Sequence, residues 1–134
     1  MPRYLRLLAM LVAWCSLGAA HAQDQLPAEM KGTGLLSQDG QVVVPWSIGI
    51  LSQEPDGTIK GRLGWFGRQC RFNDVPFIGS YRDGVLEISA PLTTPQCGAF
   101  TSTLKRSAGK AGVFEGTARI HGYFVSFAVT LEPR

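Results

Sequence analysis

The chain has 134 residues, of which 45% are hydrophobic, with 13 basic and 10 acidic side chains. This length leaves room for one domain with a modest core and gives no sign of a second domain. Two of the basic residues, Arg3 and Arg6, precede an apolar run, and the rest of the chain carries 11 basic against 10 acidic residues. So balanced a charge argues against a nucleic-acid-binding protein, which needs a basic face.

The N-terminus has the three parts of a secretory signal peptide. Arg3 and Arg6 precede the apolar residues 7–17, and the small-x-small sequence Ala20-His21-Ala22 follows. This pattern predicts cleavage after Ala22 and export to the periplasm or out of the cell. A retained anchor is the alternative, but the apolar run is shorter than the roughly 20 residues that span a membrane, so no stable span is expected after cleavage. We divide the chain into a cleavable signal peptide (1–22), a flexible lead-in (23–30) and a single β-barrel-like domain (31–134).

Two cysteines, Cys70 and Cys97, remain after the signal peptide is removed. An even pair in an exported protein is typically oxidised, and only one pairing is possible. The chain-entropy model gives roughly 3.5 kcal/mol of stabilisation for a closed loop of about 28 residues. Free thiols or a metal pair are the alternatives, but the one remaining histidine, His121, is too few to complete a zinc site. We predict a structural disulfide, and neither a metal nor a cofactor.

Apolar and polar residues alternate with a period of two along most of the remaining chain, which is typical of half-buried strands. After a first strand near residues 32–38, the second covers residues 42–50, where Val44, Trp46 and Ile48 share one face. In the third strand, residues 58–65, apolar residues alternate with Lys60 and Arg62. Further strands are predicted at residues 75–81, 85–90, 99–106, 114–120 and 123–131.

Turn signals separate these strands. Asp39-Gly40, Asp56-Gly57 and Asp83-Gly84 each lie between two predicted strands, and Asp-Gly favours the positive φ angles of a tight hairpin. Residues 109–112 and His121-Gly122 supply two more connections, and the proline-containing stretch 91–96 is predicted as a longer loop that ends at Cys97. Such short connections favour antiparallel hairpins over crossovers through a helix.

The predicted fold is therefore all-β: a small antiparallel up-and-down barrel of about eight strands with one disulfide. Closure into a barrel removes the sheet edges. Glycines within the strands, such as Gly49, Gly61, Gly79 and Gly116, favour the strong coiling of a small barrel. A two-layer β-sandwich is the alternative.

No catalytic set stands out, and we assign no catalytic residue. His121 lies at a predicted turn, where a solvated side chain is the usual finding, and no nucleophile elbow is present. Glu87 and Glu115 lie on polar strand faces. An enzyme would need them inside a barrel cavity, and a small hydrolase using these carboxylates is the alternative from the enzyme class.

One local cluster combines aromatic and arginine side chains next to a cysteine. The residues in question are Trp65, Phe66, Arg68, Arg71 and Phe72. Aromatic faces and guanidinium groups together suit binding to sugars, anionic glycans, nucleotides or a protein partner. Packing of Trp65 and Phe72 in the core, with the arginines in solvent, is the alternative interpretation. Arg62 and Arg82 are expected near this cluster.

The leading interpretation is a non-enzymatic binding module outside the cytoplasm. Its partner is predicted to be another protein, such as a hydrolase that it inhibits, or a small apolar or glycan ligand. Alanine at Trp65 and Arg68 is expected to weaken binding while leaving the fold largely intact. A structural component of an envelope assembly is a further alternative, which an exposed apolar patch would favour.

Overall fold

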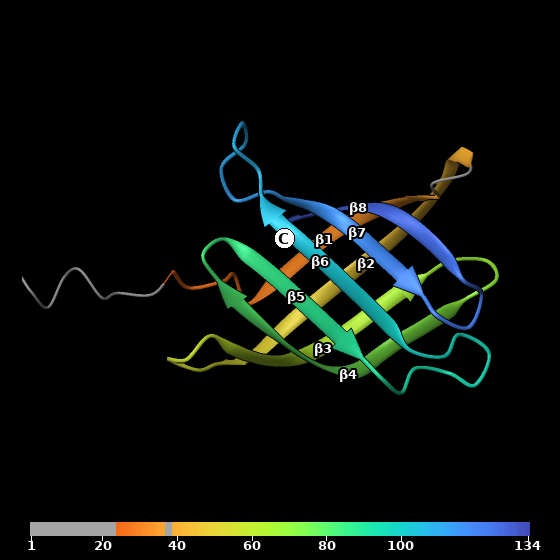
Figure 1. The fold of residues 1–134 in the computed structure, drawn as a ribbon, viewed down its shortest axis with the longest axis horizontal. Coiled ribbons are helices and arrows are strands. Elements are labelled where there is room, and N and C mark those ends of the chain that lie inside the picture. The colour runs from red at the N-terminus through yellow and green to blue at the C-terminus, as the bar shows by residue number, and fades with distance from the viewer. Residues whose placement is uncertain (1–23, 37–38) are drawn as a thin grey trace, which may run out of the picture.

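The computed structural model describes residues 24–36 and 39–134, which form a closed barrel of antiparallel strands in chain order (Figure 1). Each strand pairs with the next, and β1 also pairs with β8, which closes the sheet. The predicted up-and-down barrel is confirmed, and the sandwich alternative is wrong. The predicted signal peptide lies outside the described residues. The strands are β1 (Glu29–Leu36), β2 (Asp39–Gln53), β3 (Thr58–Phe66), β4 (Arg71–Arg82), β5 (Val85–Ala90), β6 (Phe100–Arg106), β7 (Phe114–Ile120) and β8 (Val125–Pro133).

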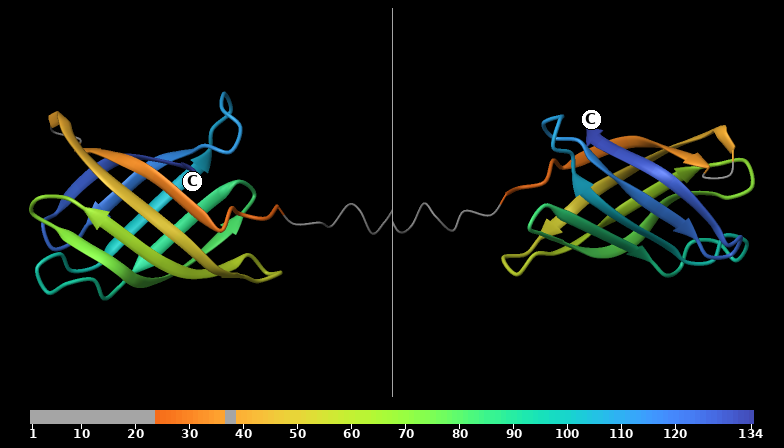
Figure 2. Two further views of the ribbon diagram at one scale, coloured as in Figure 1. Left: turned by 180° about the vertical axis from the view of Figure 1, so that it is seen from behind. Right: turned by 45° about the horizontal axis from the view of Figure 1, so that its top comes forward.

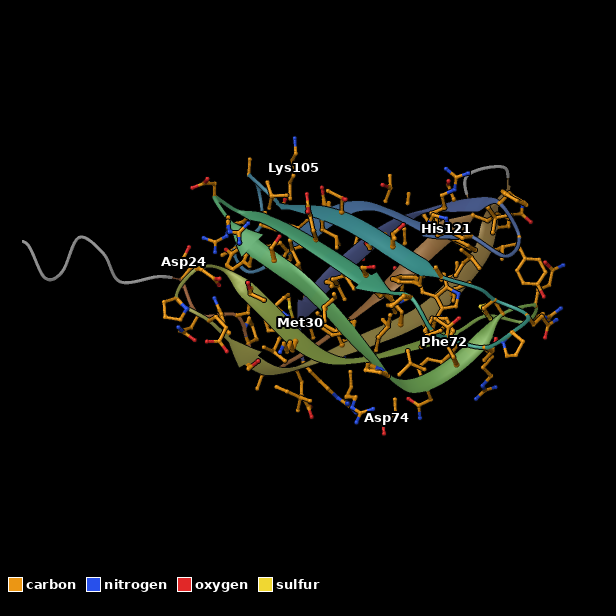
Figure 3. The ribbon with its side chains drawn as sticks, turned by 60° about the horizontal axis from the view of Figure 1, so that its bottom comes forward. Asp24, Met30, Phe72, Asp74, Lys105 and His121 are labelled. Atoms are coloured by element: carbon orange, nitrogen blue, oxygen red, sulfur yellow. A yellow bond between two sulfur atoms is a disulfide. The ribbon has the colours of Figure 1, made fainter. Side chains whose placement is uncertain are left out.

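The period-two alternation places apolar residues inside the barrel and polar residues outside. In β3, Ile59, Leu63 and Trp65 are buried, whereas Lys60 and Arg62 between them are exposed. Successive side chains of a strand point to opposite faces, so one face fills the barrel and the other meets water. Figure 3 shows Met30 inside the barrel and Lys105 and Asp74 pointing away from it.

The three Asp-Gly pairs differ in how far they follow the predicted turn chemistry, since at Asp56-Gly57 only Gly57 has a positive φ, 95°. Asp83 and Gly84 join β4 to β5 with φ angles of 53° and 76°, the paired positive values of a type I′ turn. Asp39-Gly40, predicted as a turn, instead begins β2. Pairing between β1 and β2 continues as far as Leu36 with Asp39, after a shift of register beyond Leu35.

Some strand glycines lie where neighbouring backbones approach closely. A Cβ atom on Gly116 would lie 1.9 Å from the carbonyl oxygen of Thr103, and the same holds for Gly61 and Gly79 at 2.0 and 1.9 Å from a backbone oxygen. These positions confirm the predicted role of glycine in coiling. Gly49 is different, because its nearest neighbour, the oxygen of Ala28, is 4.0 Å away.

The predicted flexible lead-in requires correction. β1 begins at Glu29, and Leu26 is buried against the core. The Leu26 backbone N–H donates to Gln53 Oε1 at 3.0 Å, and Gln53 Nε2 donates to the carbonyl oxygen of Asp24 at 2.8 Å. Asp24 also forms an ion pair with Arg106 at 2.9 Å. The apolar Leu26 side chain and these polar contacts hold the segment across one end of the barrel, which we call the closed end.

The connections fall into two groups at opposite ends of the barrel (Figure 2). The β2–β3, β4–β5 and β6–β7 connections lie at the closed end with residues 24–28. The β1–β2, β3–β4, β5–β6 and β7–β8 connections lie at the other end, which we call the mouth. No helix among residues 24–36 and 39–134 is long and apolar enough to cross a membrane.

Candidate functional site

A disulfide ties together two of the connections at the mouth. Cys70 ends the β3–β4 connection and Cys97 lies in the β5–β6 connection, and their Cα atoms are 5.5 Å apart. The predicted disulfide is confirmed. Because the bridge joins two loops and not two strands, it fixes the mouth of a barrel whose walls are already hydrogen-bonded.

Hydrogen bonds add the β7–β8 connection to the same rim. The Tyr123 hydroxyl donates to the carbonyl oxygen of Gln69 at 2.9 Å, across from β7–β8 to β3–β4. The Gly122 N–H donates to the carbonyl oxygen of Cys97 at 2.8 Å. A Cβ atom on Gly122 would lie 2.5 Å from that oxygen, so only glycine allows this approach. Three of the four mouth connections are thus held in one rigid rim.

A cavity of about 640 Å³ opens inside this rim, and we call it the mouth cup. Its floor is made by inward-facing residues of the strands. Its walls are made by the adjoining ends of β1 and β2 and by the β3–β4 and β7–β8 connections with their flanking strand ends. Most of the lining is apolar. The lining residues are Leu36, Gln41, Val42, Val43, Val44, Trp65, Phe66, Gly67, Arg68, Gln69, Cys70, Ile120, Tyr123, Val125 and Phe127.

Aromatic side chains fill the barrel beneath the mouth cup. The Trp65 ring lies 4.9 Å from that of Phe127 and 5.4 Å from that of Phe100, centroid to centroid, and Trp46 packs on both Trp65 and Phe100. Two of these contacts, Trp46–Trp65 and Trp65–Phe127, are edge-to-face, an arrangement that stabilises a core beyond simple area burial. The Trp46 indole N–H donates to the carbonyl oxygen of Thr130 at 3.0 Å, so its polar atom is satisfied. The cup is therefore a shallow site on a packed core and not a channel into the barrel.

The structure places three of the five predicted binding residues on the mouth cup. Trp65, Phe66 and Arg68 line it. Phe72 is buried behind the lining, with its ring 6.0 Å from that of Phe100. Arg71 is exposed, and its guanidinium lies 5.5 Å from the Phe66 ring centroid, outside the cup.

Trp65 belongs both to the cup and to the core. Only 1% of its surface is exposed. Replacing a buried tryptophan with alanine typically costs about 3–5 kcal/mol. The expectation that alanine at Trp65 leaves the fold largely intact therefore conflicts with its burial, and Trp65 is not a useful position for testing binding.

Residues of the cup that the sequence analysis missed come from β2, from the β7–β8 connection and from β8. Val43 is 54% exposed and Val42 is 42% exposed, and both line the cup. The sequence signal for them is the run Val42-Val43-Val44. In a strand with one solvent-facing side, the middle residue of three consecutive positions, or both of its neighbours, should be polar. Tyr123, Val125 and Phe127 alternate along the predicted strand 123–131, and this pattern does not distinguish the lining of a cavity from a packed core.

Arg68 is the one charged side chain among the described residues that line the mouth cup. It is exposed, and it forms no ion pair with any carboxylate whose side chain the structure describes. Two other arginines expected near the cluster lie elsewhere. Arg62 pairs with Asp74 on the outer face of the barrel, and Arg82 donates to the carbonyl oxygen of Asp56 at the closed end.

The carboxylates proposed for an enzymatic alternative lie outside the barrel. Glu87 and Glu115 are exposed on the outer face, while Trp46, Leu63 and Phe127 occupy the interior. The hydrolase built on these two residues is therefore wrong. His121 is exposed at the mouth, where its Nε2 lies 2.9 Å from the Thr101 hydroxyl (Figure 3). Across the described part of the chain, no group of three or more His, Cys, Asp or Glu side chains could hold a metal ion.

Comparison with known proteins supports the fold. Neither a family model nor a curated protein matches the chain. The solved structure of EF1p2_mFAP2b bound to DFHBI is similar, with a TM-score of 0.56 and 14% sequence identity over 81% of this chain and 94% of that one. A redesigned β-barrel, b11L5F_LGL, gives a TM-score of 0.54 and 14% identity over 81% of this chain and 91% of that one. At this identity the likeness concerns the barrel fold alone.

Proposed function

We propose that this protein is an exported, non-enzymatic binding module that holds a small, largely apolar ligand in the mouth cup. The observation that carries the proposal is the apolar lining of a cavity of about 640 Å³ inside a cross-linked rim. Sites for small molecules are typically concave, mostly apolar and of about 300–1,000 Å³. EF1p2_mFAP2b, a barrel of the same fold, is bound to DFHBI, so the fold is compatible with a ligand.

The rigid rim supports binding because it reduces the conformational entropy that the protein loses when a ligand binds. The disulfide and the hydrogen bonds from Tyr123 and Gly122 hold three connections together before any ligand arrives. Preorganisation of this kind increases affinity by reducing the ordering that accompanies binding. The walls of the cup that come from the β3–β4 and β7–β8 connections therefore need little rearrangement to enclose an apolar group.

Export is supported by two independent features. The signal-peptide pattern of residues 1–22 predicts passage across a membrane. The Cys70–Cys97 disulfide is typical of proteins in oxidising compartments. We propose a periplasmic or secreted location for the processed chain.

A second candidate is a protein partner that docks on the connections at the mouth. Leu92 in the β5–β6 connection and Phe124 in the β7–β8 connection are 81% and 82% exposed. Large apolar side chains displayed at one end of a small domain are common at protein contacts. This candidate predicts that both residues are needed for binding, whereas a small ligand in the cup does not require them.

Titration with the neutral fluorescent probe N-phenyl-1-naphthylamine tests the cup directly. We expect the probe to bind the processed protein, and Val43→Ser to weaken binding. Ile78→Ser is the matched control, because Ile78 is 57% exposed against 54% for Val43 but lies on the outer face of β4, away from the cup. Absence of binding, or an equal loss in the two variants, would contradict the proposed site.

Mass spectrometry of the protein from its own host tests the natural ligand and the export. Under native conditions, a bound small molecule supports the mouth cup, and a bound protein supports the second candidate. Under denaturing conditions without reductant, the measured mass should equal that of a chain that begins at Gln23. It should be lower by the two hydrogens that the cysteine thiols lose when the disulfide forms. A mass that includes residues 1–22 would contradict the proposed processing.

A further inference from the structure

The mouth cup combines an apolar lining with a single positive charge. We propose that its ligand is an amphipathic anion, whose apolar body enters the cup and whose carboxylate, sulfonate or phosphate group contacts the Arg68 guanidinium. The inference rests on the proposed function, in that the cup is the ligand site. It adds the chemical class of the ligand and the residue that recognises it.

The position of Arg68 is set by a closed loop. The Gly67 N–H donates to the carbonyl oxygen of Cys70 at 3.1 Å, which leaves Arg68 and Gln69 at the tip of the β3–β4 connection. The disulfide at Cys70 and the hydrogen bond from Tyr123 to Gln69 anchor the loop on the C-terminal side of Arg68. The backbone beneath Arg68 is thus held firmly while its side chain borders the cup.

The guanidinium of Arg68 is available to a ligand. Three other arginines, Arg62, Arg106 and Arg134, pair with carboxylates, but Arg68 has no such partner among the carboxylate side chains that the structure describes. A guanidinium offers several N–H donors in a planar fork that matches a carboxylate or phosphate. Beside an apolar lining, such a contact is less screened than on an open surface.

The distribution of charge between the two ends favours an anion at the mouth. Asp24, Asp56 and Asp83 border a hollow at the closed end together with one cation, Arg82, so that hollow has an excess of negative charge, whereas no carboxylate is among the described residues that line the cup. Arg71, on the same side of the rim, adds a second positive charge. The field of such an arrangement attracts an anion toward the cup and repels a cation.

A pair of probes with the same aromatic skeleton separates the contribution of the ligand's charge to affinity from that of its apolar contacts. 8-Anilinonaphthalene-1-sulfonate carries a sulfonate group that N-phenyl-1-naphthylamine lacks. We expect the processed, oxidised protein to bind the sulfonate probe more tightly, and added salt to weaken that probe selectively because screening acts on the charge. Near-UV circular dichroism on each sample excludes binding to partly unfolded protein.

The Arg68→Gln variant tests the residue. We expect its affinity for the sulfonate probe to fall about fivefold, the size expected for an exposed charge pair, and its affinity for the neutral probe to change less than about twofold. Arg119→Gln is the matched control, because Arg119 is an exposed cation on the outer face of β7 near the mouth that does not line the cup. It should leave both affinities unchanged.

The two probes also distinguish the two ways in which this reasoning can fail. If neither probe binds, the mouth cup is not a ligand site, and the proposed function fails together with the inference. If both bind with equal affinity, and Arg68→Gln behaves like Arg119→Gln, the cup is a site for neutral apolar ligands and only the anion inference is overturned.

Discussion

Phe124 combines a left-handed backbone with an exposed aromatic side chain. Its φ angle is 54°, and 82% of its surface is exposed in the β7–β8 turn. A bulky residue rarely adopts this conformation, whereas glycine and asparagine adopt it readily. The two other non-glycine residues with positive φ among those described are Asp74 and Asp83, which tolerate it better. Phe124 therefore carries strain that its slight burial does not offset.

Replacing Phe124 with asparagine should stabilise the protein. Relief of the left-handed strain is expected to raise the free energy of unfolding by about 1 kcal/mol. Chemical denaturation measures the change. Phe124→Ala is the control, since it removes the ring but keeps a residue that is unsuited to this φ, and equal stability of the two variants would contradict the explanation.

Asp56 is a residue whose hydrogen bonds make stability depend on pH. Its Oδ1 accepts a hydrogen bond from the Thr58 N–H at 2.9 Å in the β2–β3 turn. Hydrogen bonding from the backbone and side chain of Thr58 lowers the pKa of the Asp56 carboxyl, and the charge of Arg82 acts in the same direction. A carboxyl group with a lowered pKa stabilises the fold while it is ionised.

The sign of the effect follows from this shift. The contribution of Asp56 is present above the ordinary aspartate pKa of about 4, and it is lost as the pH falls through the lower folded value. Asp56→Asn should therefore lose less stability than the original protein between pH 5 and pH 2. Denaturant titrations across this range measure the difference, and curves that remain parallel would show that the hydrogen bond does not couple to ionisation.

At the scale of the element, glycines decide how closely the strands approach. Gly116 in β7 faces the carbonyl oxygen of Thr103 and the Cα of Leu104, at 1.9 and 2.7 Å from an added Cβ. Both neighbours belong to the backbone of β6, which cannot move without disturbing its hydrogen bonds to β5 and β7. The sheet is coiled tightly here because no side chain keeps the strands apart.

Gly116→Ala and Gly49→Ala form a matched pair for this explanation. The first should destabilise the barrel by about 1–3 kcal/mol through overpacking. The second, with 4.0 Å of space, should change stability by no more than about 0.5 kcal/mol. Thermal unfolding of both variants measures the contrast, and similar losses would show that glycine acts through strand propensity and not through close approach.

At the scale of the whole molecule, the two ends of the barrel are closed in different ways. The N-terminal segment covers one end through Leu26 and the Asp24–Arg106 ion pair. Covalent and hydrogen-bonded links between loops brace the other end and leave the cup open. A single barrel thus has one end covered by the N-terminal segment and one end that carries the cup proposed as the ligand site.

Removing the disulfide should affect both stability and binding. A Cys70→Ser, Cys97→Ser double variant is expected to lose roughly 3.5 kcal/mol of stability, because its unfolded chain is no longer cross-linked. Its affinity for N-phenyl-1-naphthylamine should also fall, since the β3–β4 connection is then held mainly by hydrogen bonds. Denaturation and probe titration measure the two effects, and an unchanged affinity would show that the hydrogen bonds alone hold the rim.

The sequence by itself determined the strands, most of the turns and the disulfide, because these depend on local rules. Alternation with a period of two places Ile59, Leu63 and Trp65 on one face wherever the strand lies, and Asp83-Gly84 favours its turn through its own backbone preferences. Two remaining cysteines allow one pairing. Two local predictions were wrong. Asp39-Gly40 was predicted as a turn but belongs to β2, and Leu26 was placed in a flexible lead-in but is buried against the core, which the pattern of the sequence does not reveal.

Only the tertiary structure decided the composition of the mouth cup. Pairing of β1 with both β2 and β8 closes the barrel and brings Val43 and Phe127 to the same cavity as Trp65. The aromatic–arginine cluster was visible in the sequence, but alternation alone could not show that Phe72 packs inward while Arg68 borders the opening. These positions depend on contacts between distant strands, which are set by the closure of the sheet and not by the neighbours of each residue in the chain.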